Sequence, residues 1–87
     1  MSRVDELRAG VDQVDLEIQR LVRRRRELSL RIQSLRLRDG GGRYDLTREE
    51  LVVAAYASAL GPRGADLAEA VLQVCRGPVT SPGATSG

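Results

Sequence analysis

The chain has 87 residues, enough for one domain whose own core would be marginal, so we expect self-association. Its 14 basic residues are all arginine, 12 residues are acidic, histidine is absent and there is one cysteine. This composition excludes Ser-His-Asp and Cys-His nucleophiles, an internal disulfide and a multi-cysteine zinc site, so any enzymatic chemistry must rest on fixed charge. The net charge of +2 and the lack of any apolar stretch near ~20 residues predict a cytoplasmic protein that binds neither nucleic acid nor a membrane.

A long helix is predicted from Val4 to Arg38, where apolar residues recur at alternating steps of three and four. At 1.5 Å per residue it extends roughly 50 Å, too far to be buried within its own domain. We therefore expect it to lie along other helices, including that of a second copy. We call its apolar positions the seam: Val4, Leu7, Val11, Val14, Ile18, Leu21, Leu28, Ile32 and Leu35.

Three glycines, Gly40 to Gly42, are expected to end the long helix. The second helix starts within residues 45–50, where Thr47 and Glu50 match a capping box, and it runs toward Leu60.

A turn is expected over residues 61–64, followed by a third, short helix with Asp66 as its N-cap and Gly77-Pro78 as its end. Cys75 is interpreted as a small buried apolar residue of that helix. The predicted fold is all-α, with one long and two shorter helices in a domain of residues 1–78 and a disordered tail over residues 79–87.

Arg25 occupies a position where the seam requires an apolar residue. A guanidinium that faces a helical core is costly unless an anion pairs with it. Two interpretations stay open: Arg25 sets the register or extends its head to water, or it binds an anionic ligand. Arg36 follows eleven residues later, about 20° around the helix and about 16 Å along it, so the two arginines share a face that could hold a small dianion.

Arg8 flanks the seam but lies roughly 25 Å from Arg25 within one helix. In an antiparallel pair of long helices, the start of one helix would lie near the middle of the other. Arg48 and Glu49, at the start of the second helix, could close the same space from the side. The sequence thus predicts a composite cationic pocket at a dimer interface.

These spaced residues resemble the all-helical (AroQ-type) chorismate mutases, over about residues 4 to 77. The resemblance is greatest to the short three-helix subclass (AroQ delta) that pairs with DAHP synthase. It implies an intertwined antiparallel homodimer of the chorismate mutase II type. The implied reaction is rearrangement of chorismate to prephenate in aromatic amino acid biosynthesis, with no metal and no cofactor. The residues that carry the resemblance are Leu7, Arg8, Val11, Asp12, Asp15, the run Arg24 to Leu28, Arg36, and Asp45 to Glu49, with Leu60-Gly61-Pro62, Gly64, Asp66-Leu67-Ala68 and Cys75-Arg76-Gly77 at the end.

The resemblance also implies roles for individual residues. Arg8 from the partner subunit and Arg25 would grip the two carboxylates of chorismate in its reactive conformer. Arg36 would face the ether oxygen, where negative charge develops in the transition state. Glu49 would accept a hydrogen bond from the ring hydroxyl. The implied catalytic residues are therefore Arg36, Arg25 and Glu49.

Three further residues are implied to contact the substrate. Arg48 would support a carboxylate, Asp45 would assist near the hydroxyl, and Arg76 corresponds to an arginine at the pocket edge. Members of the short subclass have low activity alone and are activated by docking on DAHP synthase through a basic C-terminal tail. Residues 78–82 of this chain are neutral instead.

Other functions stay open at this point. The same pocket would suit an isochorismate-pyruvate lyase or an amino-deoxychorismate mutase of a specialised pathway. The arginine run from Arg23 to Arg26 also fits a non-catalytic, Arg-rich interaction module that binds nucleic acid or an acidic protein. The near-balanced charge and the position of Arg25 inside the seam disfavour that module.

Overall fold

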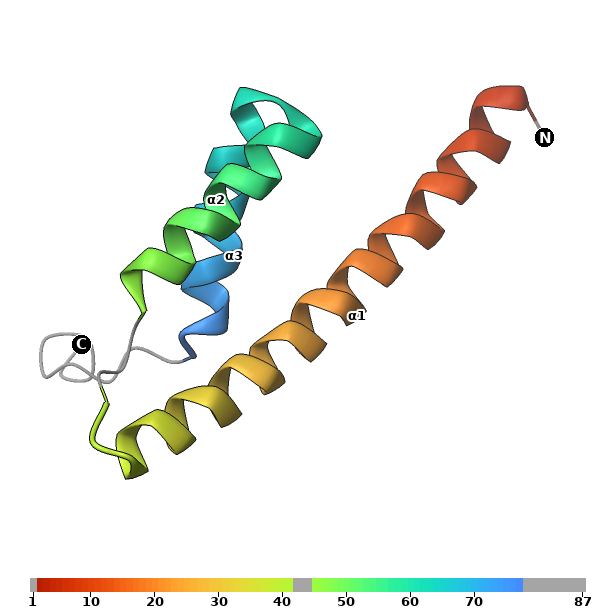
Figure 1. Cartoon of the computed structure of the whole chain (residues 1–87). Helices are drawn as coiled ribbons and strands as arrows, with labels where there is room; N and C mark the ends of the chain where they lie inside the picture. Colours follow the sequence, from red (N-terminus) through yellow and green to blue (C-terminus); the bar gives the residue numbers. More distant parts are fainter. Residues whose placement is uncertain (1, 42–44, 78–87) are drawn as a thin grey trace, which may run out of the picture.

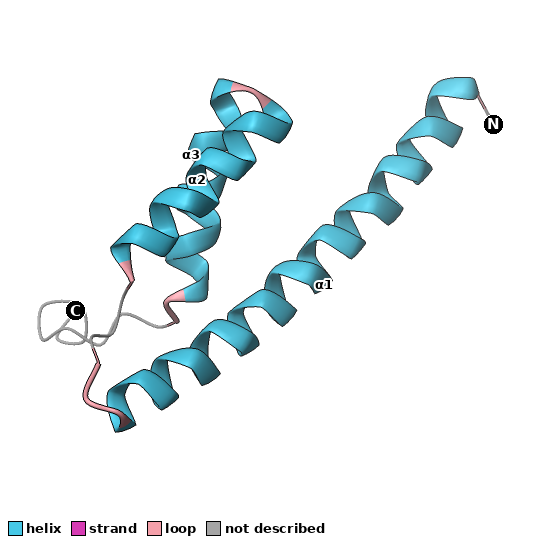
Figure 2. Ribbon diagram, in the orientation of Figure 1, coloured by secondary structure: helices cyan, strands magenta, loops and turns pink. Residues whose placement is uncertain are grey.

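The computed structural model describes residues 2–41 and 45–77 of the chain. Within these ranges the chain forms three helices, α1 (Arg3–Arg38), α2 (Leu46–Leu60) and α3 (Pro62–Cys75), and no strand (Figure 2). The all-α prediction with one long and two shorter helices is confirmed. The tail expected over residues 79–87 lies outside the described residues, as does the last glycine of the predicted helix stop.

Both ends of α1 are fixed by local sequence. The side chain of Ser2 accepts a hydrogen bond from the amide of Asp5 at 3.1 Å, and acidic residues in the first turn oppose basic residues in the last, as the helix dipole favours. The helix ends at Arg38, and Gly40 follows with a φ of 81°, a left-handed conformation suited to glycine. The predicted end of the long helix is therefore confirmed.

The start of α2 and the start of α3 correct two predictions. Asp45, not Thr47, caps α2, because Asp45 Oδ1 accepts from the amide of Arg48 at 3.0 Å and Thr47 already lies inside the helix. The third helix begins at Pro62 instead of after Asp66. Proline fits the first turn of a helix, and Gly61, with a φ of 85°, turns the chain directly from α2 into α3.

The core is small and centres on α3, which packs against both α1 and α2 and most extensively against α2. Gly64 is buried where the two shorter helices meet, since a Cβ atom there would come within 2.7 Å of the Tyr56 carbonyl carbon. Cys75 is 2% exposed, which confirms its interpretation as a buried apolar residue. The buried apolar side chains are Val52, Ala68, Val71, Leu72 and Cys75.

The long helix is poorly covered in the single chain. No residue of α1 is buried, and seam residues such as Leu7 and Leu21 are 65% and 66% exposed. Figure 1 shows the N-terminal part of α1 diverging from the α2–α3 pair, while its C-terminal part approaches the end of α3. Within the described residues, no helix has the length and apolar character required to cross a lipid bilayer.

Candidate active site

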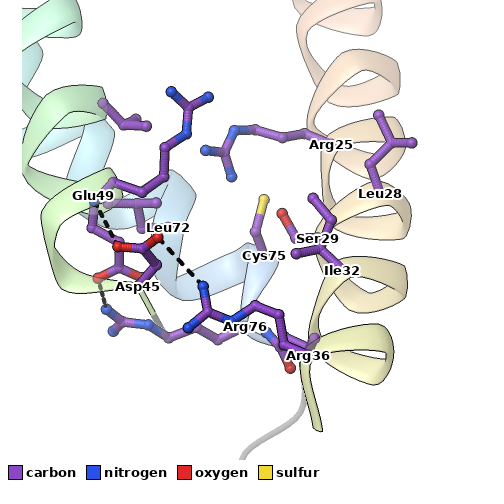
Figure 3. Close-up of a pocket in the computed structure, with 13 residues that line it drawn as sticks. Arg25, Leu28, Ser29, Ile32, Arg36, Asp45, Glu49, Leu72, Cys75 and Arg76 are labelled. Atoms are coloured by element: carbon purple, nitrogen blue, oxygen red, sulfur yellow. Dashed lines mark hydrogen bonds and ion pairs between the residues drawn. The ribbon is translucent and has the colours of Figure 1, made fainter. Parts of the chain in front are cut away.

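A pocket lies where the C-terminal half of α1 faces the start of α2 and the end of α3. Its volume is about 260 Å³. Figure 3 shows Arg25 reaching from α1 across this space, with Arg36, Asp45, Glu49 and Arg76 grouped opposite and below it. The other lining residues are Leu28, Ser29, Ile32, Gln33, Arg48, Val52, Leu72 and Cys75. Apolar side chains thus form part of a wall that carries four arginines and two carboxylates.

Arg36 and Asp45 form one ion pair of the pocket. Arg36 Nη1 donates to Asp45 Oδ2 at 3.3 Å, while Asp45 Oδ1 caps α2. The Arg48 amide and, after it, the Arg36 guanidinium hold the pKa of the Asp45 carboxyl below its ordinary value of 3.8. Asp45 therefore stays ionised near neutral pH and fixes the end of α1 to the start of α2.

Arg76 and Glu49 form a second, shorter ion pair. Arg76 Nη2 donates to Glu49 Oε1 at 2.6 Å. The side chains are 35% and 20% exposed, so this pair is less accessible to solvent than the Arg24–Glu27 pair on the surface of α1. It connects α2 to the residue that follows α3.

Arg25 and Arg48 provide the excess charge of the pocket. Neither guanidinium has a carboxylate partner among the described residues, and Arg25 is half-buried. The two ion pairs neutralise the remaining charged groups, so the pocket retains two uncompensated positive charges. A small dianion of matching size would satisfy both, and charge-assisted contacts to carboxylates are among the strongest that arginine makes.

The chemistry available here is binding and fixed-charge stabilisation. Within residues 2–41 and 45–77, no group of three or more carboxylate or thiol side chains converges in a way that could hold a metal ion. The guanidiniums can bind an anion and stabilise developing negative charge, and Glu49 can accept a hydrogen bond.

Comparison with known proteins identifies the family. The chain is 40% identical over 74 residues to the intracellular chorismate mutase of Mycolicibacterium smegmatis, an alignment that covers 85% of this chain and 71% of that protein. It is 45% identical over 74 residues to the intracellular chorismate mutase of Mycobacterium tuberculosis, covering 85% of this chain and 70% of that protein. The chain belongs to the chorismate mutase family. The resemblance inferred from the spaced arginines is confirmed.

A solved structure supports the same assignment. It is a non-covalent complex of DAHP synthase and chorismate mutase from Corynebacterium glutamicum with a bound transition state analogue. The match has a TM-score of 0.82 at 30% identity and covers 87% of this chain and 92% of the matched chain. No protein-family model matches the chain.

The structure brings six of the seven residues that the chorismate mutase resemblance singled out into one pocket. These are Arg25, Arg36, Asp45, Arg48, Glu49 and Arg76. Arg8 is the exception, because it lies on the N-terminal part of α1 and does not line the pocket of its own chain. A chorismate mutase site that uses Arg8 must therefore obtain it from another copy.

Sequence reasoning missed Ser29 and Gln33, which line the same pocket. Their signal was present in the spacing, because they follow Arg25 by four and eight residues and so lie on its helix face, as does Arg36. Leu72 and Val52 also line the pocket, and no sequence pattern indicated that they would. Contacts between helices carry no comparable signal in a single sequence.

Proposed function

We propose that this pocket is the site where the chain rearranges chorismate to prephenate. The observation that supports the proposal is the pair of uncompensated arginines, Arg25 and Arg48, which matches the two carboxylates of chorismate. The reaction breaks the ether C–O bond and forms a C–C bond in one concerted step. It needs a folded substrate and a stabilised ether oxygen, and both are tasks for fixed positive charge.

Individual residues divide these tasks. Arg25 and Arg48, together with Arg8 of a second copy, bind the carboxylates and hold the substrate in its folded conformer. Arg36 donates to the ether oxygen as negative charge develops there, and such donors act more strongly on the transition state than on the ground state. Glu49 accepts the hydrogen bond of the ring hydroxyl, beside Asp45 and Arg76. No proton transfer and no covalent intermediate are required.

The working enzyme is a homodimer in this proposal. Every seam residue of α1 is at least 42% exposed in one chain, and an apolar stripe of this length needs a partner surface. A second copy laid antiparallel along α1 covers the stripe and supplies Arg8 to the pocket of its partner. Residues 1–78 then form the catalytic domain.

DAHP synthase is the partner enzyme that we infer. The solved chorismate mutase from Corynebacterium glutamicum that this chain resembles is held in a complex with that enzyme. The same kind of assembly would allow the mutase to be activated by docking, although residues 78–82 are neutral.

The test is a substrate comparison with product identification. The purified chain is incubated with chorismate, isochorismate and 4-amino-4-deoxychorismate, with and without a DAHP synthase, and products are identified by mass spectrometry. We expect loss of chorismate absorbance and formation of prephenate. Salicylate and pyruvate from isochorismate, with chorismate untouched, would contradict the proposal, as would conversion of the amino analogue alone.

A further inference from the structure

The ion pair between Arg76 and Glu49 assigns Arg76 a task different from substrate binding. We propose that Arg76 is a positioning residue, which holds Glu49 in the orientation that receives the ring hydroxyl of the substrate. The inference rests on the proposed function, because it concerns the role of Glu49 in that site.

Arg76 projects from a backbone that is fixed on both sides. Its amide donates to the carbonyls of Leu72 at 3.1 Å and Gln73 at 3.3 Å, and Gly77 donates to Val74 at 3.2 Å. Gly77 has a φ of 82°, and a Cβ atom there would meet Leu30 Cδ2 of α1 at 2.9 Å. The end of α3 is therefore packed closely against α1, and the origin of the Arg76 side chain is determined by the fold.

The two carboxylate oxygens of Glu49 have different surroundings. Oε1 accepts from Arg76 at 2.6 Å, whereas Oε2 has no hydrogen-bond partner among the described residues. One oxygen is thus used to orient the carboxylate and the other stays available to a hydroxyl. At 20% exposure the Glu49 carboxylate is partly shielded from water, so the pair is screened less than one on the open surface.

A carboxylate of the substrate competes poorly with Glu49 for the guanidinium of Arg76. Capturing it would require Arg76 to leave a short ion pair and would strand the partly buried charge of Glu49, which is costly. Arg25 and Arg48 already face the pocket without carboxylate partners among the described residues. The charge balance therefore places Arg76 with Glu49 and leaves the other two arginines for the dianion.

The decisive experiment is a double-mutant cycle measured on chorismate with Arg76→Met, Glu49→Gln and the double variant. If Arg76 acts through Glu49, Arg76→Met lowers kcat by about tenfold with KM within about twofold of wild type. The double variant then has a kcat within about twofold of Glu49→Gln alone, since the two residues act as a unit. Arg76→Lys, which keeps the charge, restores part of kcat.

The control is Arg63→Met, which removes an arginine at the opposite end of α3 whose side chain is 96% exposed, and it should leave both constants unchanged. Circular dichroism and thermal unfolding check that each variant is folded. If Arg76→Met does not fold, the cycle is run with Arg76→Lys. Two outcomes overturn the inference: a penalty that appears mainly in KM and is fully retained in the Glu49→Gln background, or a rise in kcat, which would mean that Arg76 blocks Glu49.

A readout without substrate separates this inference from the proposed function. Carbon-13 relaxation of the Glu49 side chain in the ligand-free protein should report an ordered carboxylate in the wild type and a more mobile one in Arg76→Met. Equal mobility in the two would contradict the positioning role even if chorismate is converted. Failure of the wild type to convert chorismate would contradict the proposed function, while the relaxation data would still decide whether Arg76 holds Glu49.

Discussion

Asp45 shows how one side chain can serve both folding and the site. Its Oδ1 caps α2 by accepting from the Arg48 amide, and its Oδ2 accepts from Arg36, the residue assigned to the ether oxygen. The resemblance implied only that Asp45 assists near the substrate hydroxyl. The structure adds a physical link between the first turn of α2 and the guanidinium at the end of α1.

Asp45→Asn removes the negative charge of this side chain but keeps an oxygen that can cap α2. Because the pKa of Asp45 is lowered in the folded state, its ionised form stabilises the fold above its ordinary pKa of 3.8, and this contribution is lost as the pH falls through the lowered folded pKa. We expect Asp45→Asn to lower the melting temperature at pH 7 and the difference from wild type to shrink below about pH 4. Thermal melts across this range check it, and a difference that is constant or grows in acid would contradict the pairing.

Replacing Arg36 with Ala tests the charge aimed at the ether oxygen. Turnover should fall by a factor of about a hundred or more, as is typical when such a donor is lost. The folded state should survive, because Arg36 is only half-buried and Asp45 still caps α2 through its other oxygen when Arg36 is removed. Chorismate kinetics and thermal unfolding give the two readouts, with Arg38→Ala, an exposed arginine outside the pocket, as the control. An unfolded Arg36→Ala protein would count against a catalytic assignment.

At the residue scale, site residues could be predicted from the sequence where a charged residue interrupted the apolar seam of the long helix. Arg25 was found because it interrupts the seam, and Arg36 because it shares that face. The pairing of Glu49 with Arg76 could not be found this way, because the two residues are 27 positions apart and meet only after α2 and α3 pack. The helical period places residues on a face, but it does not say which other element that face meets.

At the scale of elements, boundaries were predicted less well than the elements themselves. The glycines after α1 gave its end, but the capping box at Thr47 competed with Asp45, and the carboxylate two residues earlier caps α2. The start of α3 was placed too late because Gly61-Pro62 is typical both of a turn and of a helix start. Where the local sequence allows two helix starts, the packing of the neighbouring helices decides between them.

Gly64 provides a prediction about how α2 and α3 pack. Gly64→Ala should lower the free energy of unfolding by about 1–3 kcal/mol, because the added Cβ would overlap the Tyr56 carbonyl and push the helices apart. Gly10→Ala is the matched control: Gly10 lies within α1 and an added methyl group would meet nothing within 4 Å, so the change should be neutral or stabilising by about 0.5–1 kcal/mol. Denaturant unfolding distinguishes them, and equal stability of the two variants would contradict the close approach.

The seam of α1 carries the prediction about assembly. Val14→Glu places a charge on the exposed seam and should convert the proposed dimer to a monomer, with a corresponding loss of activity. Gln13→Glu adds the same charge on a neighbouring polar position and should leave the dimer intact. Light scattering after size-exclusion chromatography measures both. A wild-type monomer, or a dimeric and active Val14→Glu variant, would contradict the role of the seam.

On the scale of the whole molecule, one chain is an incomplete enzyme under the proposed function. Six site residues line one pocket and the seventh, Arg8, lies far along α1 beside apolar side chains that a single chain leaves uncovered. The length of the long helix indicated this arrangement from the sequence, since no domain of this size could bury it alone. Two copies laid antiparallel would satisfy the apolar seam and complete both pockets together.

Subunit complementation tests the shared pocket most directly. Arg8→Ala and Arg36→Ala are each expected to be nearly inactive as homodimers. In a mixed dimer one pocket carries both substitutions and the other carries neither, so equal amounts assembled together should recover about one quarter of wild-type activity. Recovery of that size is the predicted result. Absence of recovery, with mixed dimers demonstrated by mass spectrometry, would contradict a pocket built from two chains.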